Sequence, residues 1–120
     1  MKVARLTSAD GRELARVEVA ATARQRSRGL LGRAALLPGH AMWLAPCRSI
    51  HTVGMQFTID VVFLDRDDRV AAIRENVVPF RLAWGGWRSR GVLEFAAGEV
   101  ARLGLACGQQ LTLRHESSDS

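Results

Sequence analysis

One stretch of eight residues constrains the fold more than any other part of this 120-residue chain. Residues 57–64 read Phe-Thr-Ile-Asp-Val-Val-Phe-Leu, and apolar side chains alternate along one face. A period of two is typical of a β-strand, and here the second face also becomes apolar toward the C-terminal end. Because a strand covered on both faces lies inside a sheet, the pattern predicts a central strand.

The turns on either side of apolar runs predict further short strands. The charged run at 65–68 predicts a turn, after which 69–75 returns as a hairpin partner. An Asp-Gly pair at positions 10 and 11 predicts a second hairpin between strands over 1–7 and 13–20. Additional strands are expected at 41–45, 50–53, 92–95 and 109–114.

Two short helical segments are expected between these strands. Thr22 and Gln25 have the spacing of a capping box, which predicts a helix over 23–31 that Gly32 ends. A second helical turn is expected over 98–103, before Gly104. Many short strands with one helix in the N-terminal half and a second helical turn predict a mainly β fold, a small antiparallel barrel or sandwich.

Length and composition narrow the organisation and the location. The chain fits one domain over 1–120, with a polar end at 115–120 that we expect to fray. No apolar run approaches the ~20 residues that span a bilayer, and no signal peptide is recognised. We therefore expect a soluble, cytoplasmic protein. The net charge of +5 is almost entirely due to arginine, and a solvated basic surface explains it without a nucleic-acid partner.

Residues 28–33 read Arg-Gly-Leu-Leu-Gly-Arg, residues 59–65 read Ile-Asp-Val-Val-Phe-Leu-Asp, and residues 92–95 read Val-Leu-Glu-Phe before Ala-Gly. In order and spacing these stretches resemble the motifs of a bacterial and archaeal family, domain of unknown function 192. The resemblance implies a compact β-rich fold and no established activity. Many members carry Phe-Trp-Met-Lys-Asn-Thr where this chain has Ile-His-Thr-Val-Gly-Met at 50–55, so the roles of that aromatic residue and that lysine do not transfer.

Three potential soft-metal ligands, Cys47, His51 and Met55, are spaced four residues apart. On a strand this spacing separates side chains by roughly 13 Å, which is too far to share an ion. The β-branched residues nearby favour an extended segment, and only a tight turn at Ser49 or Gly54 would bring the three together. We therefore predict no metal site and no cofactor.

A thiol-dependent enzyme that uses Cys47, His51 and Asp60 is one alternative. A neighbouring base or positive charge activates a thiol, and Arg48 is adjacent in sequence. However, no recognised nucleophile motif surrounds Cys47. Both cysteines, Cys47 and Cys107, are expected to be free thiols. Asp60 lies within the predicted central strand and needs a partner there, for which the candidates are His51, Arg28 and Arg33.

A nucleic-acid binder is the second alternative, with the arginines of the Arg24–Arg33 helix on phosphates. Such arginines more often form a solvated face. Trp84 and Trp87, in an irregular segment predicted over 76–90, either cover a small core or stack on a planar ligand. Glu94 is expected to pair with an arginine.

The leading prediction is a non-catalytic binding or accessory module for a small polar ligand or a peptide, because no complete catalytic set is visible. The chain also lacks the nucleotide-hydrolysis, zinc-protease, zinc-ribbon and dinucleotide motifs. The candidate ligand-binding residues are His51, Asp60, Arg28, Arg33, Cys47, Trp84 and Trp87.

Overall fold

The computed structural model describes residues 2–116. Along the chain its elements are β1 (Lys2–Ser8), β2 (Glu13–Ala20), α1 (Ala23–Arg28), β3 (His40–Leu44), β4 (Ser49–His51), β5 (Ile59–Leu64), β6 (Val70–Val77), β7 (Leu82–Trp84), β8 (Gly91–Ala96), α2 (Glu99–Leu103) and β9 (Leu111–His115). The predicted mainly β fold with two short helices is confirmed.

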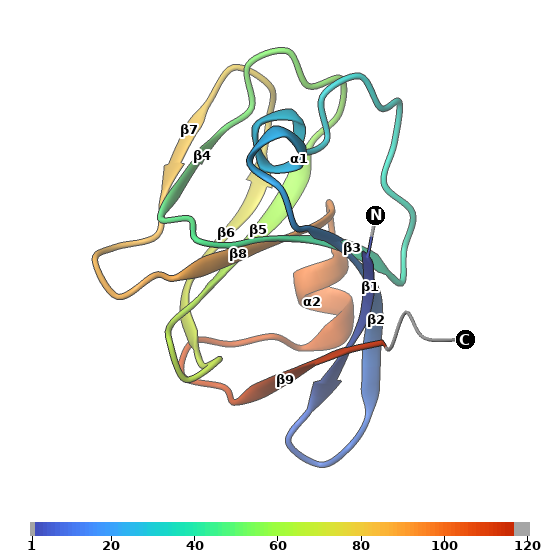
Figure 1. Ribbon diagram of the computed structural model, residues 1–120, viewed down its shortest axis with the longest axis vertical. Coiled ribbons are helices and arrows are strands. Elements are labelled where there is room, and N and C mark those ends of the chain that lie inside the picture. Colours follow the sequence, from blue (N-terminus) through green and yellow to red (C-terminus); the bar gives the residue numbers. More distant parts are fainter. Residues whose placement is uncertain (1, 117–120) are drawn as a thin grey trace.

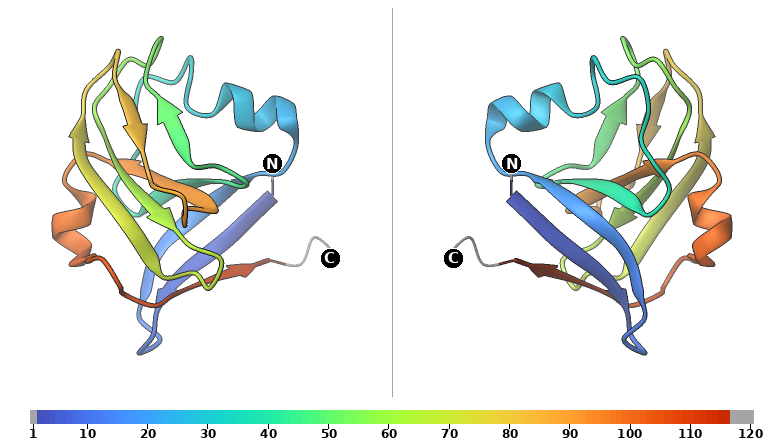
Figure 2. Two further views of the ribbon diagram at one scale, coloured as in Figure 1. Left: turned by 90° about the vertical axis from the view of Figure 1, so that its left-hand side faces the viewer. Right: turned by 90° about the vertical axis from the view of Figure 1, so that its right-hand side faces the viewer.

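A curled seven-stranded sheet in the order β6-β5-β8-β3-β2-β1-β9 forms a half-barrel (Figure 1). Its neighbouring strands are antiparallel except for β2 and β3, which run parallel. The small sheet of β4 and β7 lies at the same end of the molecule as α1 (Figure 2). Residues before β9 also meet the start of β6, where Val70 N–H donates to Gln109 O at 2.9 Å, and this contact curls the two edges toward each other.

The alternating side chains of β5 enter two apolar clusters on opposite faces of the sheet. Val62 and Leu64 pack in the cluster that includes residues of β1, β2 and α2. Ile59, Val61 and Phe63 pack in the cluster on the side of α1 and β4. All six residues of β5 are buried, and the strand lies between β6 and β8. The prediction of a central strand is therefore confirmed.

Two glycines let loops and strands approach aromatic rings. A Cβ atom added to Gly85 would overlap the ring of Phe63, and one added to Gly91 would overlap the ring of Trp43. The segment after β7 can therefore lie directly on the second cluster, and β8 can lie directly against the indole of β3.

The α1 helix begins as predicted but is shorter, and α2 begins at Glu99, one residue after the predicted start. The Thr22 hydroxyl accepts a hydrogen bond from Gln25 N–H at 3.1 Å, and the Gln25 side chain accepts from Thr22 N–H. The prediction that Gly32 ends this helix is wrong, because Gly29 already leaves helical geometry with a φ of 48°. Gly104 ends α2 with a φ of 68°. Within the described residues, no helix has the length and apolar content to cross a bilayer.

Two other expectations need correction. The segment 76–90 is not wholly irregular, because β7 pairs antiparallel with β4 through Ser49 and Trp84. The predicted frayed end at 115–120 begins too early, since His115 pairs with Ala4 in the sheet. Residues 117–120 lie outside the described residues.

Candidate ligand-binding site

Glu94 is a carboxylic acid in the middle of the sheet. It lies in β8 opposite Val61 of β5 and Met42 of β3, and it points to the same face as both. Its side chain is only 4% exposed, and its neighbours on that face are apolar. A charged group in such a place is costly unless it is paired and hydrogen-bonded.

Within residues 2–116, no ion pair compensates for the burial of Glu94. Burial raises the pKa of its carboxyl group from 4.5 to about 7. Among the side chains that the structure describes, none forms an ion pair or hydrogen bond with Glu94. The expected arginine partner is therefore wrong. Since every fully enclosed polar side-chain atom in residues 2–116 has a partner, the Glu94 oxygens must reach an open space.

That space is a cavity of about 150 Å³ between β8, β4 and the residues that follow α1. Gly29 lies over the carboxyl group: a Cβ atom at this position would be 3.8 Å from Glu94 Oε1 and 3.8 Å from a methyl group of Leu44. Two of the sequence motifs, 28–33 and 92–95, therefore meet at this cavity. Its lining includes Arg26, Arg28, Cys47, His51, Met55 and Glu94.

Cys47 contributes a thiol that is not activated. The side chain is half-buried, and its Sγ donates to Ser49 O at 3.0 Å. Burial is the main reason that the pKa of the Cys47 thiol is raised, and the charge of Glu94 raises it further. A raised pKa disfavours the thiolate, which is the nucleophilic form. The second cysteine, Cys107, is exposed.

The turn at Gly54 brings His51 and Met55 to the same cavity. Gly54 has a φ of 84°, and Met55 N–H donates to Thr52 O at 3.1 Å, so the chain reverses after β4. His51 is exposed and Met55 is buried. Within residues 2–116, no three or more His, Cys, Asp or Glu side chains are arranged to hold a metal ion.

The two candidate arginines have different surroundings. Arg28 lines the Glu94 cavity, and so does Arg26, which the sequence suggested only as one of the possible phosphate-binding arginines of the Arg24–Arg33 helix. Arg33 does not line it and forms an ion pair with Glu18 of β2. Only one of the two predicted arginines thus lies beside the other candidate residues.

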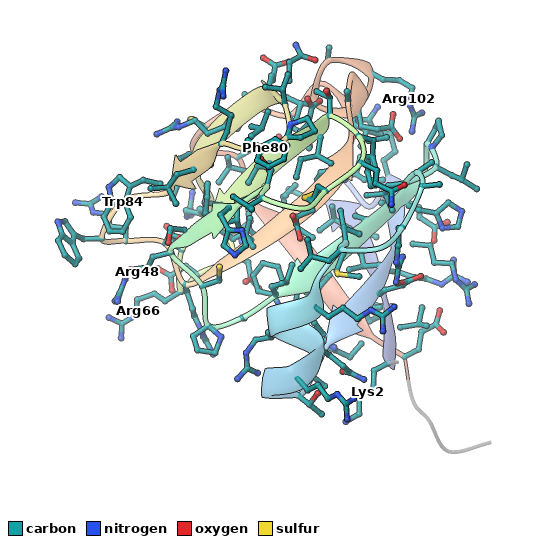
Figure 3. All side chains as sticks on the ribbon, turned by 90° about the horizontal axis from the view of Figure 1, so that it is seen from above. Lys2, Arg48, Arg66, Phe80, Trp84 and Arg102 are labelled. Atoms are coloured by element: carbon teal, nitrogen blue, oxygen red, sulfur yellow. The ribbon has the colours of Figure 1, made fainter. Side chains whose placement is uncertain are left out.

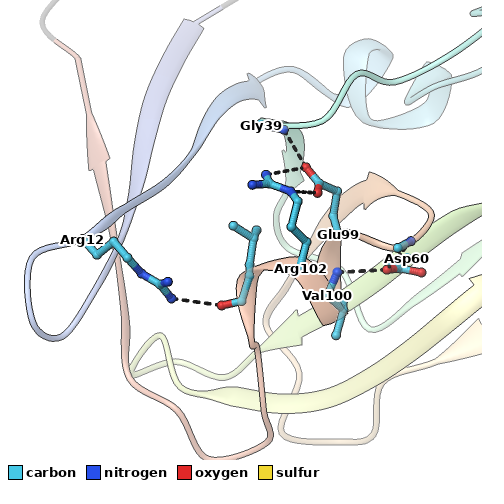
Figure 4. Close-up of polar contacts among 8 residues, drawn as sticks. Arg12, Gly39, Asp60, Glu99, Val100 and Arg102 are labelled. Carbon is cyan, nitrogen blue, oxygen red and sulfur yellow. Dashed lines mark hydrogen bonds and ion pairs between the residues drawn. The ribbon is translucent and has the colours of Figure 1, made fainter.

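Asp60 lies on the opposite face of the sheet from Glu94. It is fully buried and pairs across the sheet with Phe95, one position beyond Glu94. Its carboxylate accepts hydrogen bonds from the backbone N–H groups of Asn76 at 2.9 Å, Gly98 at 3.0 Å and Val100 at 3.0 Å. Figure 4 shows Asp60 beside the start of α2. These bonds tie β5 to α2 and β6, away from His51 and Cys47.

The two tryptophans lie against each other but border different hollows. Their ring centroids are 5.1 Å apart and the rings are nearly perpendicular. Trp84 lines a groove beside β6, whereas Trp87 lines a larger cavity that also includes Cys47. The seven predicted site residues therefore do not form one pocket: Arg28, Cys47 and His51 come together, and Arg33, Asp60 and the tryptophans lie elsewhere.

Sequence reasoning missed Glu94 as a cavity-lining residue. The sequence did contain an indication of this position. Glu94 lies between Leu93 and Phe95 in a strand whose other residues are all apolar. A carboxylate at a buried strand position needs either donors from the protein, which Asp60 has, or a ligand, so the position of Glu94 made it a candidate site residue.

The sequence and the fold are similar to those of uncharacterised proteins. The model of the DUF192 family, described as "Uncharacterized ACR", matches residues 5–113. A protein of unknown function from Novosphingobium aromaticivorans is 27% identical with a TM-score of 0.80, over 92% of this chain and 83% of that one. A candidate transcription regulator from Sinorhizobium meliloti is 30% identical with a TM-score of 0.78, over 93% and 92% of the two chains. No curated protein matches the sequence.

Proposed function

We propose that this chain, which belongs to the DUF192 family, is a non-catalytic binding module that holds a small polar ligand with a protonated amine against Glu94. The observation that carries the proposal is a buried carboxyl group that faces a small cavity and has no hydrogen-bond or ion-pair partner among residues 2–116. The family is uncharacterised, and the class of ligand is inferred from the chemistry of this cavity.

A protonated amine supplies the hydrogen-bond donors and the positive charge that the Glu94 carboxylate lacks in the protein. Its N–H groups donate to the carboxylate oxygens, and its positive charge offsets the buried negative charge. The attraction is stronger here than in water because Leu30, Leu44 and Ile50 surround the site with apolar atoms. At about 30 Å³ per water-sized group, the cavity of about 150 Å³ holds a ligand of about five non-hydrogen atoms.

The arginines suggest what the other end of the ligand carries. Arg26 and Arg28 line the same cavity from α1, so a ligand with a carboxylate opposite its amine would have partners for both groups. Small amino acids fit this description. We therefore expect glycine to bind more tightly than methylammonium, which lacks the carboxylate.

The two alternatives have less support. Catalysis by Cys47 requires a lowered thiol pKa, whereas the pKa of Cys47 is raised, and Asp60 lies on the other face of the sheet. Nucleic-acid binding through the Arg24–Arg33 helix stays a prediction, and it is weakened because α1 ends at Arg28 and Arg33 pairs with Glu18.

Calorimetric titration with glycine, methylammonium, acetate and tetramethylammonium tests the proposal. Glycine should bind at pH 8, and about tenfold more weakly at pH 6, because only the ionised form of a carboxyl group with a pKa of about 7 attracts the amine. The charged or titratable groups that face Glu94 across the cavity are Arg26, Arg28, Cys47 and His51.

The variant Glu94→Gln separates the titration of Glu94 from those of its neighbours. It should abolish binding of glycine and methylammonium, and tetramethylammonium, which has no N–H donor, should not bind the wild type. The matched control Glu75→Gln removes an exposed carboxylate and should bind glycine like the wild type. Equal affinity of Glu94→Gln and the wild type, or no binding of any amine at pH 8, would refute the proposal.

A further inference from the structure

A second cavity, of about 780 Å³, opens where three loops meet at one end of the sheet. The loops are residues 46–48 before β4, residues 65–67 in the turn between β5 and β6, and residues 87–90 before β8. Cys47 borders this cavity and the Glu94 cavity, but the other lining residues differ.

Hydrogen bonds between the loops fix the walls of this cavity. Cys47 N–H donates to Arg90 O at 2.7 Å, and Arg90 N–H donates to Leu64 O at 2.8 Å. The hydroxyl group of Ser89, which is 2% exposed, donates to Cys47 O at 2.9 Å. Because these bonds exist before a ligand arrives, little ordering of the loops is needed on binding.

The cavity carries an excess of positive charge. Four exposed arginines line it: Arg48, Arg66, Arg88 and Arg90. Within residues 2–116 none of them forms an ion pair with an acidic side chain. Arg48 and Arg66 lie along the same edge of the molecule as Trp84 (Figure 3).

The two acidic residues of the lining, Asp65 and Asp67, offset only part of the charge of the four arginines. Asp65 is occupied by its own turn, since its Oδ1 accepts from the backbone N–H groups of Asp67 and Arg69 at 2.9 and 3.0 Å. Asp67 leaves a carboxylate at the cavity as an acceptor for hydroxyl or amino groups of a ligand.

Trp87 adds an exposed aromatic surface to the arginines. Its side chain is 81% exposed, although indole rings usually bury most of their surface in folded proteins. Its carbonyl oxygen accepts from Arg48 Nε at 3.2 Å, and its ring contacts Trp84 edge to face. The residue is thus positioned by its neighbours while its indole remains accessible. An accessible indole beside arginines is the combination on which nucleobases stack.

We propose that this cavity binds a nucleotide unit, with the base stacked on Trp87 and the phosphate held by the arginines. Asp67 accepts a hydrogen bond from a ribose hydroxyl or an exocyclic amine. The volume of the cavity is several times that of the Glu94 cavity and accommodates a base and a sugar as well as a phosphate. A free nucleotide and a nucleotide within a single strand share this chemistry, and the experiment distinguishes them.

Isothermal titration calorimetry at low salt with AMP, thymidine monophosphate, adenosine, inorganic phosphate and a single-stranded oligothymidine measures the binding. AMP should bind more tightly than adenosine or phosphate, because only AMP reaches both Trp87 and the arginines. If the affinity of the oligonucleotide per nucleotide is comparable to that of thymidine monophosphate, the ligand class is a free nucleotide. Binding of the oligonucleotide at least tenfold tighter than that of thymidine monophosphate identifies a single strand.

Variants separate a built site from general charge attraction. Trp87→Ala should weaken AMP binding roughly fivefold or more through lost stacking. Arg66→Ala/Arg88→Ala should weaken it roughly tenfold and reduce its dependence on salt. Arg16→Ala/Arg114→Ala removes the same charge from exposed positions on β2 and β9 and should leave the affinity within twofold of the wild type.

Three results would overturn the inference: no binding of AMP or oligonucleotide at low salt, unchanged AMP affinity in Trp87→Ala, or equal losses in the two double-arginine variants. Circular dichroism of each variant confirms that it is folded. Glu94→Gln should still bind AMP, so failure of the amine proposal and failure of the nucleotide proposal are distinguishable.

Discussion

Replacing Glu94 with glutamine should stabilise the protein at alkaline pH. The folded state holds the pKa of Glu94 at about 7, against an ordinary value of 4.5. Below pH 4.5 the group is protonated in both states and makes no difference. Between pH 4.5 and 7 the unfolded chain releases the proton first, so the wild type loses about 1.4 kcal/mol of stability per pH unit. Above pH 7 the loss is complete.

The shift of two and a half pKa units corresponds to about 3 kcal/mol at pH 8. Glutamine has nearly the same shape and no ionisation, so Glu94→Gln should be more stable than the wild type by up to about 3 kcal/mol at pH 8. This advantage should largely disappear at pH 4.5. The titrations of groups that do not interact with Glu94 are common to both proteins and cancel in the difference, and the Cys47 thiol, whose pKa burial raises above its ordinary value, contributes little up to pH 8.

Urea unfolding at pH 4.5, 6 and 8, followed by circular dichroism, gives the free energy of unfolding of each protein. Glu75→Gln, at an exposed position, is the control and should follow the wild type at every pH. Parallel curves for Glu94→Gln and the wild type between pH 4.5 and 8 would show that the Glu94 carboxyl group is not buried without a partner, and the amine proposal would fail with it.

Three further predictions concern other parts of the structure. Asp60→Asn should lower the free energy of unfolding in urea by about 2–4 kcal/mol, because the charge that accepts three backbone N–H groups is lost. The affinity for glycine should not change. A loss of glycine binding without destabilisation would contradict the structural role of Asp60. Gly85→Ala should destabilise the fold by about 1–3 kcal/mol through overlap with Phe63, and an unchanged melting temperature would contradict the close approach. The variant Cys107→Ser leaves Cys47 as the one thiol, which should react slowly with iodoacetamide at pH 8 because its pKa is raised. Adding Glu94→Gln should make the reaction faster, since the Glu94 charge contributes to that raised pKa. Equal rates in the two variants would show that Glu94 and Cys47 do not interact.

Local chemistry made several elements predictable. The Asp-Gly pair forms the hairpin of β1 and β2, with Gly11 at a φ of 88°. Thr22 and Gln25 form both hydrogen bonds of the capping box. These elements depend on groups within a few residues of each other, so the sequence pattern contains the interactions that form them. The alternation of β5 was readable for the same reason.

Pairing between distant segments was less predictable. The parallel alignment of β2 with β3 depends on how the residues between them cross the sheet, and no local pattern encodes that path. β4 and β7 have three residues each, too few to show a period, and they are strands because they pair with each other. Gly29 ends α1 before Gly32 by adopting a φ of 48°, and it lies beside the Glu94 carboxyl group, which is distant in sequence.

The candidate site shows the same division. The alternation of side chains along β5 shows that Asp60 and Val61 point to opposite faces of the sheet. It does not show which of these faces α1 covers, and therefore which face holds the cavity. Met55 joins Cys47 and His51 at the Glu94 cavity because of the turn at Gly54. A role in ligand binding for Arg28, Cys47, His51 and Trp87 stays a prediction, which the AMP titration of Trp87→Ala tests for Trp87.

Asp60 and Glu94 occupy successive rungs of the ladder between β5 and β8, one on each side of the sheet. This placement makes the two acids a lock on strand alignment. A slip of one residue between these strands would turn one strand's side chains to the wrong face. If β8 slipped, Glu94 would enter the cluster around Phe95, where the backbone donors at the start of α2 are already bound to Asp60. If β5 slipped, Asp60 would lose those donors. Either misalignment would leave a carboxylate enclosed by apolar atoms without hydrogen-bond donors. The two acids therefore favour a single alignment of the strands at the centre of the sheet.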